Sequence, residues 1–478
     1  MKIEVEKFRR KAHEGLNNAQ QRELLVRLPL IFKGLRDYSF SSLPDAKGAL
    51  EKGAAIRRES IANLPVYLEA FEKNATKNGV NVVWARDYRE ACDFIIDLAR
   101  KKGVKTITKG KSMLSEEMDL NHALGDIGID VFETDLGEFI AQQMKRAPFH
   151  IVGPALNIPA EEIADLFVSV MGVEKTMDLN GLTMQARGFL REKFRRAEMG
   201  ITGVNMAVTD TGSIILVENE GNIRYSTGAP KTHVAVMGIE KVVPTMNDAL
   251  HMLRLLTRSC TGQAISSYVN FINGPKRAGE LDGPEELYVV IVDAGRTKIY
   301  ADPDFRQVLG CIKCGACLNV CPVWNKVGGY AYGWVYSGPI GSILNPLFVG
   351  ADRARDLYHA TTLCGACKDA CPAGIDHPRL FLKLREKRAS GDRTWRAKKP
   401  PILERLTFSL WAWGISGETR YRRAGSLVRW ALKPFMKAGE IRKLPGIGKG
   451  WTQSRNLPAP ATKSFKERWS DIERGITK

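Results

Sequence analysis

The chain has 478 residues, of which 44% are hydrophobic and 26% charged, with a formal net charge of +18. This composition excludes a disordered chain, and the length predicts two or three domains, because single hydrophobic cores stop growing at roughly 250 to 300 residues. No stretch reaches the roughly 20 apolar residues of a membrane span, and the N-terminus lacks the apolar core of a signal peptide, so we expect a cytoplasmic protein.

Residues 1–75 are predicted to form helices that pack against the domain after them. Apolar residues recur there at intervals of three and four, in RELLVRLPLIFKGL and in SIANLPVYLEAFEKNA. From Asn81 the pattern changes to the short apolar runs NVVWA, VKTIT, IDVFET and HIVGPAL, separated by the helical stretches YREACDFIIDLARKKG and SMLSEEMDLNHALGDI. Such alternation predicts a parallel sheet with helices on both faces.

Strands become more frequent further along the chain. The segment GVNMAVTDTGSIILVENEGN predicts a β-hairpin around Asp210, Thr211 and Gly212. Three further strands are predicted in THVAVMGI, AISSYVNFI and ELYVVIVD. We therefore expect one α/β domain over residues 76–300.

Two loops of this domain are candidates for a ligand site. After the strand VKTIT, backbone amides and two cations can hold a carboxylate or a phosphate, with the residues Thr108, Lys109, Gly110, Lys111 and Ser112. After the strand IDVFET come Glu133, Asp135 and Glu138, on the side where open α/β sheets bind ligands. The alternative for both loops is structural, with capped helices and solvated lysines.

Seven of the nine cysteines lie between Cys311 and Cys371, and their spacing predicts iron–sulfur clusters. Cys311, Cys314, Cys317 and Cys321, followed by Pro322, spell C-x2-C-x2-C-x3-C-P, a pattern in which three thiolates hold one cluster and the fourth reaches a second. Zinc is the competing metal, but zinc sites seldom use three cysteines at successive intervals of this kind. Cys92 and Cys260 stand apart, and we expect buried thiols there.

The second cysteine motif is one ligand short, because Thr361 stands in the position that matches Cys311. If the motifs exchange their fourth ligands, the first cluster is held by Cys311, Cys314, Cys317 and Cys371, and the second by Cys321, Cys364 and Cys367. The second cluster is then [3Fe-4S], or [4Fe-4S] with an open iron, or [4Fe-4S] completed by His359, Asp376 or Cys260. It is either a relay of different potential or, through an open iron, a Lewis acid.

Residues 391–478 form a basic tail rich in tryptophan. The tail has 20 Lys and Arg against 7 Asp and Glu, and it contains Trp395, Trp411, Trp413, Trp430, Trp451 and Trp469. Short amphipathic helices are predicted in RLTFSLWAW and SLVRWALKPFMKAG. Such a tail suits an anionic surface, either the inner face of the cell membrane or an acidic partner, whereas no nucleic-acid recognition motif is visible.

The sequence resembles the lactate utilisation protein B family of bacterial iron–sulfur proteins over nearly its whole length. The resemblance rests on CIKCGACLNVCPVWNKVGGYAYGWVYSGPIG, TTLCGACKDACPAGIDHPRLFLKLR, TKGKSM, FETDLGEFI, HIVGPALNIPAEEIADLF and the hairpin segment. It implies an α/β LUD domain like sugar-phosphate isomerases and CoA transferases, followed by an α-helical dicluster ferredoxin-like domain. We expect four parts, at 1–75, 76–300, 301–390 and 391–478.

The resemblance also implies a function. Members take part in the oxidation of L-lactate to pyruvate, with two partners of the same operon: an iron–sulfur protein with CCG motifs and a protein with a single LUD domain. This chain is then an electron-transfer subunit, and no nicotinamide or flavin fingerprint follows any strand. Two alternatives remain, a LUD domain that is itself catalytic with an open-iron cluster, and clusters that only hold the fold.

Overall fold

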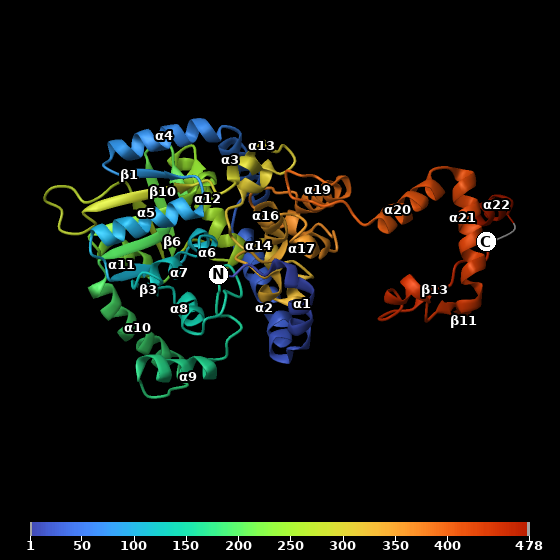
Figure 1. Ribbon diagram of the computed structural model, residues 1–478, viewed down its shortest axis with the longest axis horizontal. Coiled ribbons are helices and arrows are strands. Elements are labelled where there is room, and N and C mark those ends of the chain that lie inside the picture. The colour runs from blue at the N-terminus through green and yellow to red at the C-terminus, as the bar shows by residue number, and fades with distance from the viewer. Residues whose placement is uncertain (1, 476–478) are drawn as a thin grey trace. The chain divides into compact units, whose positions relative to one another are not determined.

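The computed structural model describes residues 2–475, apart from the side chain of Ile447. The chain divides into two compact units at Lys398, and each is described by itself below. The first unit contains an N-terminal group of helices, an α/β domain and the cysteine-rich region, and the second, here called the C-terminal unit, spans residues 399–478 (Figure 1).

The predicted N-terminal helices are confirmed. A short 3₁₀-helix, η1 (Val5–Lys7), precedes α1 (Phe8–Asn17), α2 (Ala19–Ser41), α3 (Ala46–Ala62) and α4 (Leu64–Lys77). Asn18 and Asp45 begin α2 and α3, because their side chains accept hydrogen bonds from backbone N–H groups that the first turn leaves free. In Figure 1, α1 and α2 lie beside the cysteine-rich region, where α1 contacts α17 (Arg355–His359) and α2 contacts α14 (Ala316–Asn319). Helix α4 contacts β1 (Asn81–Ala85).

A six-stranded parallel sheet forms the centre of the α/β domain, as predicted. Its strand order is β1-β10-β7-β4-β2-β3, and every neighbouring pair is parallel. The strands are β1 (Asn81–Ala85), β2 (Thr106–Lys109), β3 (Asp130–Glu133), β4 (Met199–Gly203), β7 (Thr232–Gly238) and β10 (Glu286–Val292). The central strand β7 is buried throughout, which explains why THVAVMG has no polar alternation.

Different elements cover the two faces of this sheet. On one face the core is built with α5 (Tyr88–Lys101), α6 (Met113–Glu117) and α7 (Leu120–Gly125). On the other face α4 and a second sheet supply the apolar side chains. Further helices of the domain are α8 (Leu136–Gln143), α9 (Ala160–Met171), α10 (Leu179–Arg196), α11 (Asn222–Gly228), η2 (Ile239–Lys241), α12 (Met246–Cys260) and α13 (Arg296–Ala301).

The second sheet has four strands and contains the predicted hairpin. Its order is β8-β5-β6-β9, with β5 (Met206–Val208), β6 (Ser213–Glu218), β8 (Val242–Val243) and β9 (Tyr268–Ile272). The antiparallel pair β5 and β6 turns at residues 209–212, which confirms the hairpin. Gly212 has a φ of 68°, and a Cβ there would lie 2.3 Å from the backbone nitrogen of Ala75, so the turn requires glycine.

The prediction of a strand in HIVGPAL is wrong, because residues 150–156 form bends and turns. The backbone N–H of Phe149 donates to the carbonyl of Pro154 at 2.9 Å and closes a tight loop. His150 is buried against the cysteine-rich region, where its ring packs 5.3 Å from that of Trp324. The start of this run, with His150 and Ile151, is therefore buried against the cysteine-rich region and not within the sheet, whereas Val152 and Leu156 are exposed.

The cysteine-rich region is built from short helices. They are η3 (Arg306–Gly310), α14 (Ala316–Asn319), α15 (Trp324–Val327), η4 (Gly329–Tyr332), α16 (Gly338–Val349), α17 (Arg355–His359), α18 (Ala366–Asp369) and α19 (His377–Ser390). Trp395 packs back onto this region and is only 1% exposed, with its indole N–H donating to Asp302 at 2.8 Å and its ring against Phe305. Its prediction as one of the tail tryptophans that face an anionic surface is therefore wrong.

The C-terminal unit contains helices at both predicted places, α20 (Ile402–Ile415) and α21 (Glu418–Leu432), but the second predicted helix, over residues 426–439, ends at Leu432. It continues with η5 (Lys433–Phe435), β11 (Met436–Lys437), β12 (Glu440–Ile441), η6 (Gly446–Gly450), β13 (Leu457–Pro458) and α22 (Phe465–Glu473). The three strands form a small antiparallel sheet. Within residues 2–475, no helix combines the length and the apolar character needed to cross a bilayer.

Candidate functional site

The seven thiols of the cysteine-rich region gather in two groups. Burial raises the pKa of Cys317, and nearby Cys311, Cys314 and Cys371 raise it further. Burial likewise raises the pKa of Cys367 to about 12, and there the neighbouring thiols are Cys321 and Cys364. We call these sets the first thiol group (Cys311, Cys314, Cys317 and Cys371) and the second thiol group (Cys321, Cys364 and Cys367). The grouping coincides with the predicted ligand sets, whose binding of iron remains a prediction.

The two cysteine motifs share one backbone conformation. Lys313 and Gly315 have φ values of 60° and 82°, and the matching Leu363 and Gly365 have 53° and 87°. These left-handed residues curl each loop before a single helical turn. Backbone amides then face sulfur: Lys313 N–H donates to Cys311 Sγ, and Ile375 N–H to Cys371 Sγ, both at 3.4 Å. Such bonds stabilise negative charge on a thiolate or on a cluster.

The donor set of the region fits iron–sulfur clusters, whose usual ligands are cysteine thiolates. Cys314, Cys317, Cys321 and Cys367 are buried, Cys311 and Cys371 are half-buried, and Cys364 is exposed. No thiol of the first group is exposed, whereas Cys364 of the second group reaches the surface. In the part of the chain that the structure describes, no three His, Cys, Asp or Glu side chains are arranged to hold a single metal ion.

A narrow pocket of about 20 Å³ lies at the second thiol group. Thr361 and Thr362 line it with the three cysteines, and the Thr362 side chain hydrogen-bonds Cys364, which lowers the pKa of that thiol. The three candidates for a missing ligand lie elsewhere. Asp376 pairs with Lys368 at 2.7 Å, His359 Nδ1 meets the Arg355 carbonyl at 2.9 Å, and Cys260 lies beside Cys314 of the first group.

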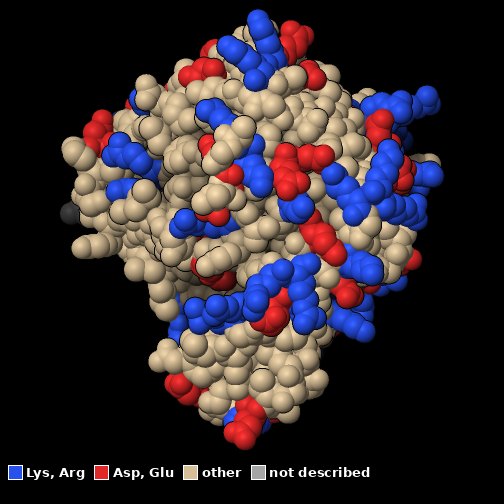
Figure 2. Space-filling view, turned by 90° about the vertical axis from the view of Figure 1, so that its left-hand side faces the viewer, with Lys and Arg blue, Asp and Glu red and all other residues tan. Residues whose placement is uncertain are grey.

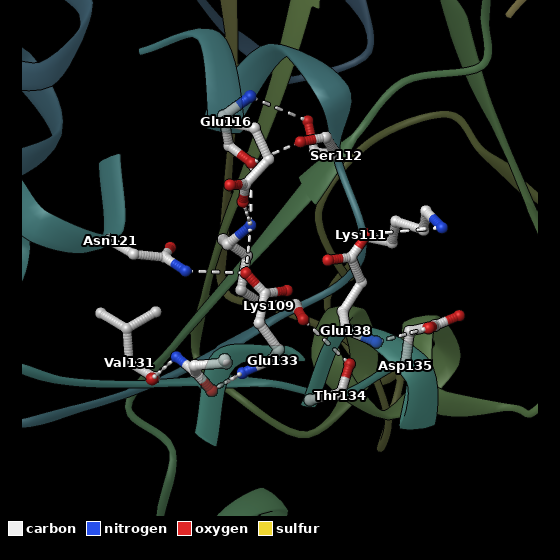
Figure 3. Close-up of polar contacts among 12 residues, drawn as sticks. Lys109, Lys111, Ser112, Glu116, Asn121, Val131, Glu133, Thr134, Asp135 and Glu138 are labelled. Carbon is white, nitrogen blue, oxygen red and sulfur yellow. Dashed lines mark hydrogen bonds and ion pairs between the residues drawn. The ribbon is translucent and has the colours of Figure 1, made fainter. Parts of the chain in front are cut away.

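Most of the predicted loop at 108–112 is engaged within the protein. Lys109 is fully buried, and its ammonium lies 2.6 Å from Glu133 and 3.3 Å from Glu116 (Figure 3). Gly110 N–H donates to the Ile201 carbonyl at 2.8 Å, and Thr108 lies inside β2. Ser112 and Asp135 cap α6 and α8. Lys111 differs, because its side chain points towards Glu138, away from the Lys109 pair (Figure 3).

A cavity of about 300 Å³ lies at the carboxyl ends of β2, β4 and β7, the side that the sequence predicts for a ligand. We call it the sheet-edge cavity. Among the predicted site residues, Lys111, Ser112 and Asp135 line it, whereas Thr108, Lys109, Gly110, Glu133 and Glu138 do not. The cysteine-rich region forms part of its wall with Ile312, Lys313, Cys314 and Tyr336. The cavity therefore adjoins the first thiol group.

Two lysines of this cavity were missed by the sequence reasoning. Lys241 follows β7, so the rule that ligands bind at the carboxyl ends of strands would have found it. Lys313 lies between Cys311 and Cys314, and a search for cations within the cysteine motif would have found it.

A buried ionic network joins the α/β domain to the cysteine-rich region. Arg296 donates to Glu117 at 2.8 and 3.0 Å and to Glu240 at 2.9 Å, and all three side chains are at most 5% exposed. Tyr336 of the cysteine-rich region also donates to Glu117. Arg57 of α3 donates to four backbone carbonyls, those of Glu240, Val242, Leu309 and Gly310. The chain leading into the first cysteine motif is thereby fixed to the sheet.

Three family models match this chain. Residues 68–292 match the LUD domain, residues 307–375 the 4Fe-4S dicluster domain, and residues 384–474 the C-terminal domain of lactate utilisation protein B. The dicluster match identifies an iron–sulfur protein. A crystal structure of a DUF162 family protein from Deinococcus radiodurans covers 48% of this chain and 98% of its own, at 15% identity and a TM-score of 0.28, and it adds nothing to the assignment.

Curated relatives match nearly the whole length. Lactate utilization protein B of Bacillus licheniformis is 41% identical over 472 residues, which cover 98% of both chains. Lactate utilization protein B of Bacillus cytotoxicus is 40% identical over 475 residues, which cover 99% of both. The resemblance indicated by the motifs is confirmed, and the chain belongs to the lactate utilisation protein B family.

Proposed function

We propose that this protein transfers electrons during the utilisation of lactate, through iron–sulfur clusters held by its two thiol groups. The observation that carries the proposal is the crossing of Cys371 from the second motif into the first thiol group. A shared arrangement of this kind places two clusters side by side, and α14 of one motif contacts α18 of the other. When bound, such clusters accept and release single electrons.

The surroundings of the two thiol groups indicate which of the two clusters a partner protein can reach. No thiol of the first group is exposed, and this group adjoins the sheet-edge cavity, whereas Cys364 of the second group is exposed. A partner protein can therefore approach the second group at the surface. We propose that the partners are the CCG-motif iron–sulfur protein and the single-LUD-domain protein, in one complex that oxidises L-lactate to pyruvate.

The finer features of the fold and cofactors are part of the same proposal. The α/β domain is expected to share the fold of sugar-phosphate isomerases and CoA transferases, and the helical dicluster region to hold one [4Fe-4S] cluster and a second that is [4Fe-4S] or [3Fe-4S]. The proposal also includes domain boundaries after residues 75, 300 and 390.

A redox titration followed by EPR tests the proposed function. Protein prepared without oxygen is expected to show two iron–sulfur signals that are reduced and reoxidised reversibly. Absence of reversible reduction would favour clusters that only hold the fold. Oxidation of lactate by the purified protein alone, with an artificial acceptor, would instead favour a catalytic LUD domain.

Replacing Thr361 with cysteine is expected to leave lactate-dependent turnover intact. Thr361 lines the pocket of the second thiol group and matches Cys311 in the first motif, so the new thiol can supply a fourth ligand. Turnover is measured with the partner proteins present, and EPR reports the type of the second cluster. Thr361→Ser is the matched control, because it retains a hydroxyl. Loss of turnover in the cysteine variant alone would mean that an open iron binds substrate.

We also propose that the C-terminal unit binds an anionic lipid surface. It carries 17 Lys and Arg against 6 Asp and Glu, and α20 exposes Phe408, Trp411 and Trp413 by 62%, 62% and 61%. Exposed aromatic residues beside cations suit the headgroup region of a bilayer. On the face of the first unit seen in Figure 2, by contrast, basic and acidic side chains are interspersed.

Replacing Trp411 and Trp413 together with serine is expected to weaken binding to vesicles that contain phosphatidylglycerol by about tenfold or more, because each buried aromatic ring contributes roughly 1.5–3 kcal/mol. Sedimentation with the vesicles measures the effect. Phosphatidylcholine vesicles are expected to bind little, and salt should weaken the binding. Equal binding by a protein truncated after Lys398 would contradict the proposal.

A further inference from the structure

The sheet-edge cavity has the position and size of a ligand site. It lies at the carboxyl ends of three neighbouring parallel strands, where open α/β sheets bind ligands. Its volume of about 300 Å³ is at the small end of the range for ligand pockets. Because Ile312, Lys313 and Cys314 line it, a molecule inside would lie next to the first cysteine motif. Electron transfer alone does not require such a space.

Three lysines line this cavity, and each is only incompletely paired with a carboxylate. Lys241 and Lys313 form no ion pair within 4.0 Å among the described residues, and Lys313 lies 4.3 Å from the centre of the Tyr336 ring. Lys111 Nζ is buried and donates no hydrogen bond, although Glu138 Oε1 is 3.3 Å away. A buried ammonium without a hydrogen-bond acceptor is costly, so an anion in the cavity is its expected complement.

Glu240 and the nearby thiolates account for only part of this positive charge. Glu240 and, less strongly, Cys311 act on Lys241, and Glu240 also interacts with Lys313, so these two lysines balance Glu240 and can balance a negatively charged cluster. Lys111, however, enters from the loop after β2 and belongs to the wall formed by the α/β domain. A cluster charge alone therefore leaves the hydrogen-bonding capacity of Lys111 unused.

The other residues that line the cavity favour a ligand with a single negative charge. Glu218 and Glu220 line the cavity, with carboxylates held by the backbone N–H groups of Ile223 at 2.6 Å and Leu136 at 3.1 Å. Asp135 and Glu240 also line it. Four acidic side chains repel a dianion such as phosphate more than a monoanion. Apolar lining residues, among them Val204, Met237 and Leu256, suit an organic body.

We infer that the sheet-edge cavity binds a small organic monocarboxylate, with Lys111, Lys241 and Lys313 as its cationic anchors. Of the loop that the sequence singled out, the site uses Lys111 but not Lys109, because Lys109 and Glu133 neutralise each other. It takes its third anchor from the cysteine motif, so the cavity is complete only when the cysteine-rich region is packed on the sheet. The inference goes beyond electron transfer and stands independently of it.

Calorimetric titration of the full-length, anaerobically prepared protein tests this inference. Sodium L-lactate, pyruvate, acetate and inorganic phosphate are the probes. We expect at least one carboxylate to bind, and phosphate to bind more weakly. Lys111→Gln and Lys241→Gln are each expected to weaken carboxylate binding by about ten- to a hundredfold, the usual loss with a hydrogen bond to a charged group. The EPR spectrum of the first cluster should change on binding.

Lys231→Gln is the matched control, because Lys231 belongs to the same domain but its side chain is 79% exposed. This variant should bind the carboxylate with the same affinity as the unaltered protein. Iron and sulfide contents verify that each variant retains its clusters. Three results would overturn the inference: no carboxylate binds, phosphate binds most tightly, or both cavity variants bind as well as the control. Reversible reduction of the same sample would then still support electron transfer.

Discussion

Replacing Cys371 with serine is expected to abolish the first cluster and to leave the second in place. Cys371 belongs by position to the second motif, but its thiol acts on Cys314 and Cys317 of the first. A serine hydroxyl is a poor iron ligand, so the first thiol group keeps three ligands of four. Iron and acid-labile sulfide should fall by about half, since each of two clusters contributes a similar share. EPR identifies the cluster that remains.

The reciprocal variant provides the sharpest comparison. Cys321→Ser alters the first motif by position but is expected to remove the second cluster, because Cys321 acts on Cys367. Cys92→Ser is the control for loss of a buried thiol; Cys92 packs in α5 of the α/β domain, and iron content should not change. If Cys371→Ser removed the second signal and kept the first, the motifs would not exchange their fourth ligands.

Local patterns in the sequence were sufficient to find the parallel sheet and the edge that carries the cavity. The runs NVVWA, VKTIT and IDVFET became β1, β2 and β3, because alternation with helices leaves a buried parallel strand as the simplest arrangement. The carboxyl end of β2 then pointed to the edge where the cavity lies. Both inferences depend on residues that are close in sequence.

The wrong predictions concern residues whose packing partners lie far away in the sequence. HIVGPAL has the apolar character of a strand, but His150 is buried against Trp324, a contact across more than a hundred positions that no local pattern reveals. Trp395 is likewise withdrawn from the basic tail by Phe305 and Asp302. In both cases a long-range packing site outweighed the local propensity.

The same limit explains why only part of the predicted ligand site lines the cavity. Lys109 and Lys111 are both basic and two positions apart, and nothing nearby indicates which of them is neutralised. Lys109 pairs with Glu133 only because β2 and β3 are neighbours, in a register that sets these two residues opposite each other. Lys241 and Lys313 meet at one cavity only after the cysteine-rich region packs on the sheet. A sequence shows the candidates, and tertiary packing selects among them.

Replacing Arg296 with methionine is expected to destabilise the first unit by about 3–5 kcal/mol, the usual cost of leaving a buried charge without its partner. Glu117 and Glu240 both depend on Arg296, and their side chains are 0% and 5% exposed. Chemical denaturation of the cluster-containing protein measures the loss. Arg146→Met removes a half-exposed pair with Glu162 and should cost under about 1 kcal/mol. Equal effects of the two variants would contradict the importance of the buried network.

The stabilisation of the folded state by Arg296 should also depend on pH, in the direction set by the lowered pKa of Glu240. Burial opposes ionisation of Glu240, but the charge of Arg296 prevails and lowers its pKa from 4.5 to about 2. A carboxyl whose pKa is lower in the folded state stabilises that state fully above its unfolded value, and this stabilisation is lost as the pH falls through the folded value. The difference between the Arg296→Met variant and the unaltered protein should therefore be greatest near neutrality and narrow between pH 4.5 and about 2. Adding Glu117→Gln and Glu240→Gln to Arg296→Met removes the uncompensated charges, so this triple variant should regain part of the lost stability at neutral pH.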